Sequence, residues 1–101
     1  MIANPARGEA ALTLGGQTCL LRPSFTALVA AEAELGPLFA LCERAASGQL
    51  TLAEMTGLLW HCLSPPGAMA RDEFADALVT AGLANASPAL RVLLGQILAG
   101  Q

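Results

Sequence analysis

The sequence has no lysine and no tyrosine, and only one histidine and one tryptophan. Its five positive charges are arginines spread along the chain, and the formal net charge is −3. Proteins that bind nucleic acid gather lysine and arginine into basic patches, and binding to an anionic membrane surface needs a similar excess. The composition therefore argues against nucleic-acid and membrane partners.

Long apolar runs and paired cysteines are also missing. No apolar stretch reaches the roughly 18 residues that suggest a membrane span, and Met1-Ile2-Ala3-Asn4-Pro5 lacks the charged start and apolar core of a secretory signal. Cys19, Cys42 and Cys62 are odd in number and include no CxxC pair, which does not indicate a disulfide framework. We expect reduced, buried and inert thiols, and we place the protein in the cytoplasm.

Catalytic and metal-binding motifs are lacking as well. His61 and Cys62 are adjacent in a predicted helix, where neighbouring side chains point about 100° apart, so they do not suit a catalytic pair. Without a second histidine they do not suit a metal site either. We expect Cys62 to be buried and His61 to face solvent. The sequence predicts a non-enzymatic protein with no catalytic residue, no metal and no cofactor.

What the sequence has in excess is apolar surface. Hydrophobic residues make up 54% of the chain and charged residues only 13%, whereas a typical domain has about 25% charged residues. A chain of 101 residues forms one domain. The low charge indicates that part of its surface meets a partner protein.

The N-terminal part predicts a β-hairpin over residues 9–22, after a loose segment over residues 1–8. Gly15-Gly16 suits a two-residue turn, because such turns need positive φ. A turn centred there places Leu12 opposite Cys19. The apolar side of the hairpin is then Ala10, Leu12, Leu14, Cys19 and Leu21. Because a hairpin is not stable alone and has exposed edges, a homo-oligomer is also compatible with this pattern.

The stretch Leu21–Leu28 marks the change from strand to helix. Pro23 removes an amide donor and ends the strand, and Ser24 is a preferred helix cap. Phe25 then begins an apolar stripe, continued by Val29, that we expect to face the core.

Arg22 is predicted to tie the hairpin to this first helix. It lies opposite Glu9, with which it can form a cross-strand ion pair, although an exposed pair contributes little stability. Glu32 falls on the apolar side of the helix. It is either a carboxylate at the core edge or one buried against Arg22 or against a helix N-terminus.

Five short helices are predicted in residues 24–99, so the expected fold is α+β, mostly α, in a single compact domain over residues 1–101. Glycines, prolines and a capping box at Thr51–Glu54 set their limits. Ser64-Pro65-Pro66-Gly67 is the strongest loop signal. The expected helices cover residues 25–35, 37–47, 52–63, 71–81 and 88–99.

The last helix and Trp60 are the candidates for partner binding. The helix over 88–99 is apolar almost all round, with only Arg91 and Gln96 strongly polar, so it is either deeply buried or docked on another molecule. Trp60 flanks an apolar stripe, where it is either a core-edge residue or a partner anchor, because Trp is enriched at binding hot spots. The predicted partner-binding residues are Trp60, Leu90, Val92, Leu94, Ile97 and Leu98.

The N-terminal third also carries a denser pattern of motifs, which consists of Arg7-Gly8-Glu9, Gly15-Gly16, Leu21-Arg22-Pro23-Ser24-Phe25, Ala27-Leu28, Glu32 and Gly36. With these residues, which span about residues 4–36, the chain resembles the small tail assembly chaperones of gene transfer agents and phages. We expect the signature residues to be scaffold: Arg7, Gly8, Glu9, Arg22, Pro23, Ser24, Phe25, Glu32 and Gly36.

The resemblance implies a non-enzymatic assembly factor. Such a factor binds the tape measure protein, with the major tail protein as a second partner, before tail tube subunits polymerise, and it is absent from the finished particle. One alternative is a structural minor tail protein that stays in the particle. Another is a small regulatory or interaction domain, in which the helices over 71–81 and 88–99 form a helix-turn-helix. The acidic start of the first of these helices and the few basic residues argue against DNA binding.

Overall fold

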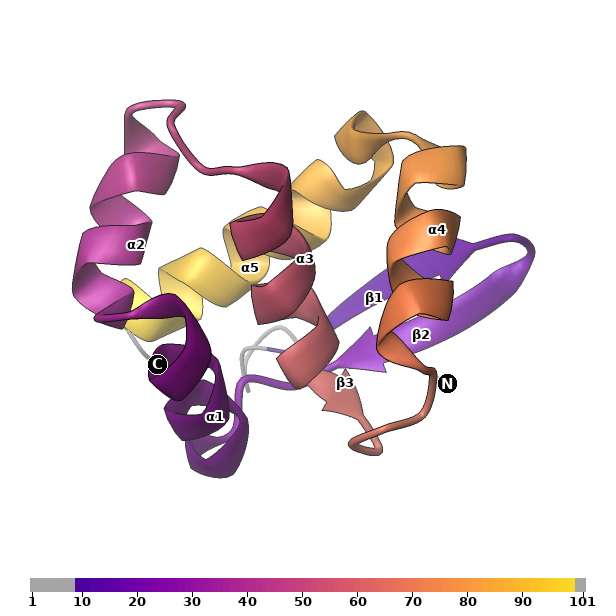
Figure 1. Cartoon of the computed structure of the whole chain (residues 1–101), viewed down its shortest axis with the longest axis horizontal. Coiled ribbons are helices and arrows are strands. Elements are labelled where there is room, and N and C mark those ends of the chain that lie inside the picture. The colour runs from indigo at the N-terminus through magenta and orange to yellow at the C-terminus, as the bar shows by residue number, and fades with distance from the viewer. Residues whose placement is uncertain (1–8, 100–101) are drawn as a thin grey trace.

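The computed structural model describes residues 9–99, which form a three-stranded antiparallel sheet and five helices (Figure 1). The α+β, mostly helical class predicted from the sequence is confirmed. The predicted segment 1–8, with the signature residues Arg7 and Gly8, lies outside the described residues. The elements in chain order are β1 (Ala10–Leu14), β2 (Gln17–Leu21), α1 (Phe25–Leu35), α2 (Leu38–Ala46), α3 (Leu52–His61), β3 (Leu63–Ser64), α4 (Arg71–Ala81) and α5 (Leu83–Ala99).

The hairpin of β1 and β2 has the predicted register. Leu12 pairs with Cys19, and the turn glycines Gly15 and Gly16 have φ of 56° and 83°. The expected apolar side is buried except for Cys19, which is half-buried. The predicted ion pair is present, with Arg22 Nε 3.8 Å from Glu9 Oε2.

A third strand, β3, was not expected. The helix predicted over 52–63 ends at His61, and Leu63–Ser64 pairs with the outer edge of β2. The amide of Arg22 extends this pairing by donating to the Cys62 carbonyl oxygen at 2.7 Å. Buried backbone groups need hydrogen-bond partners. The edge of β2 pairs with residues 62–64, so the chain forms a short strand here and the helix does not continue.

The other edge of the hairpin is also in contact with the rest of the fold. α5 packs against β1, and the Asn85 side-chain amide donates to the Thr13 carbonyl oxygen at 2.9 Å. The exposed hairpin edge that supported a homo-oligomer is therefore partly covered on both sides. The oligomeric state itself stays a prediction.

Local capping signals set most helix limits as predicted. Ser24 Oγ accepts a hydrogen bond from the Ala27 amide at 3.2 Å at the start of α1. Thr51 and Glu54 form the expected capping box at the start of α3, with reciprocal bonds of 3.1 and 3.0 Å. Pro37 is the N-cap of α2 and not its first helical residue.

Glu32 contributes to the α1–α2 junction. Its Oε2 accepts a hydrogen bond from the amide of Leu38, the first residue of α2, at 3.1 Å. Glu32 is exposed, so the alternative of burial against Arg22 or a helix N-terminus is wrong, although the carboxylate does contact the N-terminus of α2. A carboxylate there is favoured by the helix dipole.

The start of α5 differs from the prediction. The helix begins at Leu83 and not at Pro88, which lies inside it. A proline at this position removes the hydrogen bond to the carbonyl of Ala84. Ala84 is exposed, so water can hydrate that carbonyl and the helix continues. The Ser87-Pro88 pair resembles a helix start, but it is not one here.

The core lies between the helices and one face of the sheet. Figure 1 shows α3 at the centre of the view, with α1 on one side, α4 on the other and α5 crossing behind it. α1 and α4 both pack against α3, and α4 and α5 both contact β1. The largest fully buried side chains are Phe74, Leu12, Leu21, Leu41, Leu58, Leu59, Leu78, Leu93 and Cys62.

The buried face of α1 is not the predicted one. Phe25 is 83% exposed and Val29 is also exposed, whereas Ala27 and Ala31 are buried. α1 packs on α3 with these small alanines buried and with Leu28 and Leu35 half-buried against the core, which leaves Phe25 and Val29 outside. The expectation that Phe25 faces the core is therefore wrong. Val79 on α4 is exposed as well.

The hydropathy of the helices bears on membrane crossing. Among residues 9–99, no single helix is long and apolar enough to span a bilayer. Two strongly bent pairs, α1 with α2 and α4 with α5, reach that length and composition only when their two helices are added together.

Candidate partner-binding site

An apolar groove runs along one face of α5, and we call it the leucine groove. It has a volume of about 370 Å³ and lies between α5 and the segment that joins α2 to α3. Its wall on α5 has residues at positions 83, 84, 87, 90, 91 and 94, which is the spacing of one helical face. The lining residues are Ala45, Gly48, Leu50, Thr51, Leu52, Met55, Leu83, Ala84, Ser87, Leu90, Arg91 and Leu94.

A second hollow adjoins the leucine groove between α3 and α4. Its volume is about 470 Å³, and it shares Leu52 with the groove. Leu52, Val79 and Leu83, which line the two depressions, are all large apolar side chains exposed to solvent. Exposed apolar side chains that gather around a depression are typical of an interaction surface. The residues that line this hollow are Leu52, Ala53, Thr56, Arg71, Asp72, Ala75 and Val79.

Charge in the leucine groove is limited to one residue. Arg91 is the only charged side chain among the lining residues, and it is exposed. The adjoining hollow has Arg71 and Asp72 at its edge. The groove therefore suits an apolar ligand with at most a few polar contacts at its rim.

The structure places the predicted partner-binding residues in several different locations. Leu90 and Leu94 line the leucine groove. Val92 and Ile97 are half-buried against the core, and Leu98 is exposed near the C-terminal end of α5, outside the groove lining. Their roles in binding stay predictions.

Trp60 lies away from the groove, at the core edge. Its indole Nε1 donates to the Met69 carbonyl oxygen at 2.8 Å, and the Arg71 guanidinium lies 5.3 Å from the ring centroid. It also lines a smaller pocket of about 240 Å³ beside the start of α1, together with Arg22 and Ser24. Its indole N–H is thus already used within the fold.

His61 does not face solvent, contrary to expectation. Its side chain is 15% exposed, and Nε2 lies 2.9 Å from Glu34 Oε1. Arg71 donates to the same carboxylate, with Nη1 2.6 Å from Oε1. Hydrogen bonds from Arg71 and then from His61 lower the pKa of Glu34 to about 2. This cluster joins α1, α3 and α4 and is structural in character.

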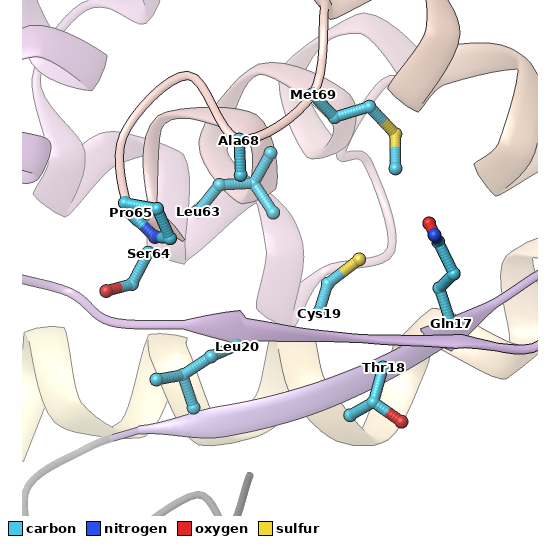
Figure 2. A pocket seen from close by; sticks show the side chains of 9 residues that line it. All are labelled: Gln17, Thr18, Cys19, Leu20, Leu63, Ser64, Pro65, Ala68 and Met69. Carbon is cyan, nitrogen blue, oxygen red and sulfur yellow. The ribbon is translucent and has the colours of Figure 1, made fainter.

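A fourth depression lies beside β2, where β3 ends. Figure 2 shows Gln17 and Cys19 on the side of β2 that faces Met69, whereas Thr18 and Leu20 point the other way. The depression has a volume of about 400 Å³. Burial raises the pKa of the Cys19 thiol, which makes it a poor nucleophile. The depression therefore contains no evident chemistry.

The remaining thiols and carboxylates do not form a reactive centre. Burial raises the pKa of Cys62 to about 12 and also raises that of Cys42. Across residues 9–99, no group of three or more His, Cys, Asp or Glu side chains lies where it could hold a metal ion. The described part of the chain therefore offers a ligand an apolar surface.

Sequence reasoning missed most of the leucine groove, because only Leu90 and Leu94 among its lining residues were predicted to bind a partner. Leu83 was missed because α5 was expected to begin at Pro88, and Leu52, which is 47% exposed, was not among the predicted partner-binding residues. Leu50 and Met55 come from a segment far from α5 in the sequence. Only the position of Leu83 immediately after Gly82, a helix-ending glycine, could have indicated the early start of α5.

Comparison with known proteins places the chain among tail proteins of phages and gene transfer agents. Residues 7–100 match the family described as phage tail tube protein, GTA-gp10, and the chain belongs to this family. No curated protein and no solved structure gave a match. The gene transfer agent and phage tail relationship inferred from the N-terminal motifs is confirmed at the level of the family.

Proposed function

We propose that this chain is a non-enzymatic tail assembly chaperone whose leucine groove holds an apolar helical segment of the tape measure protein. The observation that carries the proposal is the pair of adjoining apolar depressions that share Leu52. Binding of an amphipathic helix in an apolar groove is a common mode of peptide recognition. Membership of the tail protein family supports a tail component as the partner.

The proposed complex forms in the cytoplasm before tail tube subunits polymerise. A long apolar partner needs protection at that stage, and a small protein with an open apolar groove can supply it. The major tail protein is a second candidate partner of the same surface, since both partners take part in the same assembly. A homo-oligomer remains part of the proposal, to be tested by light scattering.

The test is co-expression of this chain with the tape measure protein, with solubility and co-elution as readouts. Leu52→Glu combined with Leu83→Glu places charge on two side chains of the groove that are 47% and 44% exposed. The matched control is Val29→Glu combined with Phe39→Glu, because these side chains are also exposed but lie on α1 and α2, outside the groove. Exposed positions are chosen so that all variants fold.

We expect the wild type and the control to keep the tape measure protein soluble, and the groove variant to lose this effect. If the wild type neither co-elutes with the tape measure protein nor changes its solubility, the proposal fails. If the groove variant acts like the wild type, the binding surface lies elsewhere.

A structural tail protein is the second candidate function, and the family description as a tail tube protein favours it. In that case the same groove would contact a neighbouring subunit in the particle. Mass spectrometry of purified particles separates the two functions. Abundant stoichiometric copies of this chain in the particle would reject the chaperone, and their absence would reject the structural protein.

A further inference from the structure

Arg91 differs from the other arginines in the described part of the chain. Arg22 pairs with Glu9, Arg44 with Glu54 and Arg71 with Glu34. Within residues 9–99, Arg91 alone among the arginines has no acidic partner. It is exposed on the lining of the leucine groove, which contains no acidic residue. A protein of net charge −3 thus presents a single unpaired positive charge at the leucine groove.

The length and shape of the leucine groove indicate which kind of ligand it can hold. Its wall on α5 extends from Leu83 to Leu94 along one helical face. At 1.5 Å per residue this wall is about 16 Å long, or about three helical turns. Leu83, Leu90 and Leu94 form a row of apolar side chains along it. A second helix packed along this row would bury its own apolar stripe against the leucines.

We propose that the occupant of the leucine groove is an amphipathic helix of about three turns with a Glu or Asp beside its apolar stripe, placed to pair with Arg91. The inference rests on the proposed function and adds the chemistry of the partner. Charge complementarity carries it, because Arg91 is the only charge on the groove lining. At the far end of the surface, Asp72 on the adjoining hollow disfavours a partner that is acidic along its whole length.

The inference is tested with two synthetic helical peptides of about 18 residues, long enough to form several turns. Both have the same leucine stripe. One has Glu beside the stripe at the positions facing α5, and the other has Lys at the same positions. Fluorescence anisotropy measures the affinity of each peptide for the full chain, for Arg91→Glu and for Arg22→Glu. Arg22→Glu makes the same charge change on an exposed residue outside the groove, so it is the matched control.

The wild type and Arg22→Glu should bind the Glu peptide about threefold to tenfold more tightly than the Lys peptide at low salt, as expected for one exposed ion pair against one repulsion. Arg91→Glu should reverse the preference. The difference should shrink in about 1 M salt, where the Debye length falls to about 3 Å.

Equal affinity for the two peptides, a preference that survives Arg91→Glu, or a reversal by Arg22→Glu would each overturn the inference. A dimer of the free chain that dissociates on Leu52→Glu with Leu83→Glu would also overturn it, because a second copy would then occupy the groove. The peptide experiment and the co-expression assay with the tape measure protein are independent tests. Failure of that assay with the peptide preference intact would reject the proposed function and keep the acidic helix as the ligand chemistry.

Discussion

Arg71 on α4 donates two hydrogen bonds to the carboxylate of Glu34 on α1, and the pair passes over Gly57 of α3. A Cβ at Gly57 would lie 3.0 Å from Arg71 Nη2 and 3.4 Å from Glu34 Oε2. The absence of a side chain at this position therefore leaves room for an ion pair that connects the two helices flanking α3.

Gly57→Ala tests this arrangement. Alanine in a helix interior is normally more stable than glycine by about 1 kcal/mol. At Gly57 the new methyl group must displace the Arg71 guanidinium or Leu35, so we expect the gain to be lost or reversed. The measurement is the free energy of unfolding in urea.

The matched control for this substitution is Gly95→Ala on α5, where a Cβ would meet nothing within 4 Å. This variant should gain about 1 kcal/mol. Compared with Arg71→Met alone, adding Gly57→Ala should restore part of the gain, because the guanidinium is then gone while Leu35 still lies 3.2 Å from the new methyl group. Equal stabilisation by the two glycine substitutions in the wild-type chain would show that the ion pair does not depend on Gly57.

Stability between pH 4.5 and about 2 should depend on Glu34. The pKa of this carboxyl is lowered from 4.5 to about 2, chiefly by the Arg71 hydrogen bonds, so the folded state holds it ionised more strongly than the unfolded state does. A carboxyl whose pKa is lower in the folded state stabilises the fold above pH 4.5. This contribution to the free energy of unfolding is lost as the pH falls toward 2. Because the side chain is 39% exposed, solvent screening limits the contribution to about 0.2–1 kcal/mol.

Unfolding of Glu34→Gln measured across this pH range provides the check. The wild type should be more stable than the variant at pH 6, and the two curves should converge as the pH falls. Glu43→Gln removes the same charge from an exposed side chain on α2 and serves as the control. A difference between wild type and Glu34→Gln that does not change with pH would contradict the assignment.

Truncation of Phe25 and truncation of Phe74 should have very different effects on stability. Phe25 is largely exposed, so Phe25→Ala should change the free energy of unfolding by no more than about 0.5 kcal/mol. Phe74 is fully buried, and Phe74→Ala should cost about 3–5 kcal/mol through lost burial and the cavity left behind. A large loss on truncating Phe25 would mean that its ring is buried in solution.

Trp60→Phe should loosen the connection between α3 and α4. The substitution keeps an aromatic ring but removes the hydrogen bond from the indole N–H to the Met69 carbonyl. Loss of one such bond typically costs about 0.5–1.5 kcal/mol. Amide hydrogen exchange at residues 67–70 should become faster, while exchange in β1 and β2 stays unchanged. Uniform acceleration across the chain would indicate global destabilisation instead.

Local sequence signals were enough to predict the hairpin and most helix limits. Gly15-Gly16 and the alternation around it specify the turn and the register, and Thr51 and Glu54 fix the start of α3 by contacts three residues apart. These features depend on neighbours in the sequence, so they can be predicted without knowledge of the tertiary structure.

The features that were missed depend on distant contacts. β3 is only two residues long, and no local signal indicates that Leu63–Ser64 pairs with β2, which lies far away in the sequence. Phe25 was expected in the core because it is apolar, but close packing of α1 on α3 selected the alanines instead. In the leucine groove, Leu90 and Leu94 were anticipated from the apolar surface of α5. Their neighbours across the groove come from the segment around Leu50, and only the fold brings the two together.

The hydrogen bond from Asn85 to the Thr13 carbonyl has a consequence for aggregation. Strands with free edges can recruit strands from other molecules, and this is a route to amyloid-like assemblies. Asn85 occupies an acceptor on the edge of β1 while α5 lies against the same strand, and β3 covers part of the opposite edge. The edges of the described sheet are therefore less available as templates for strands of other molecules, despite the large apolar surface of the chain.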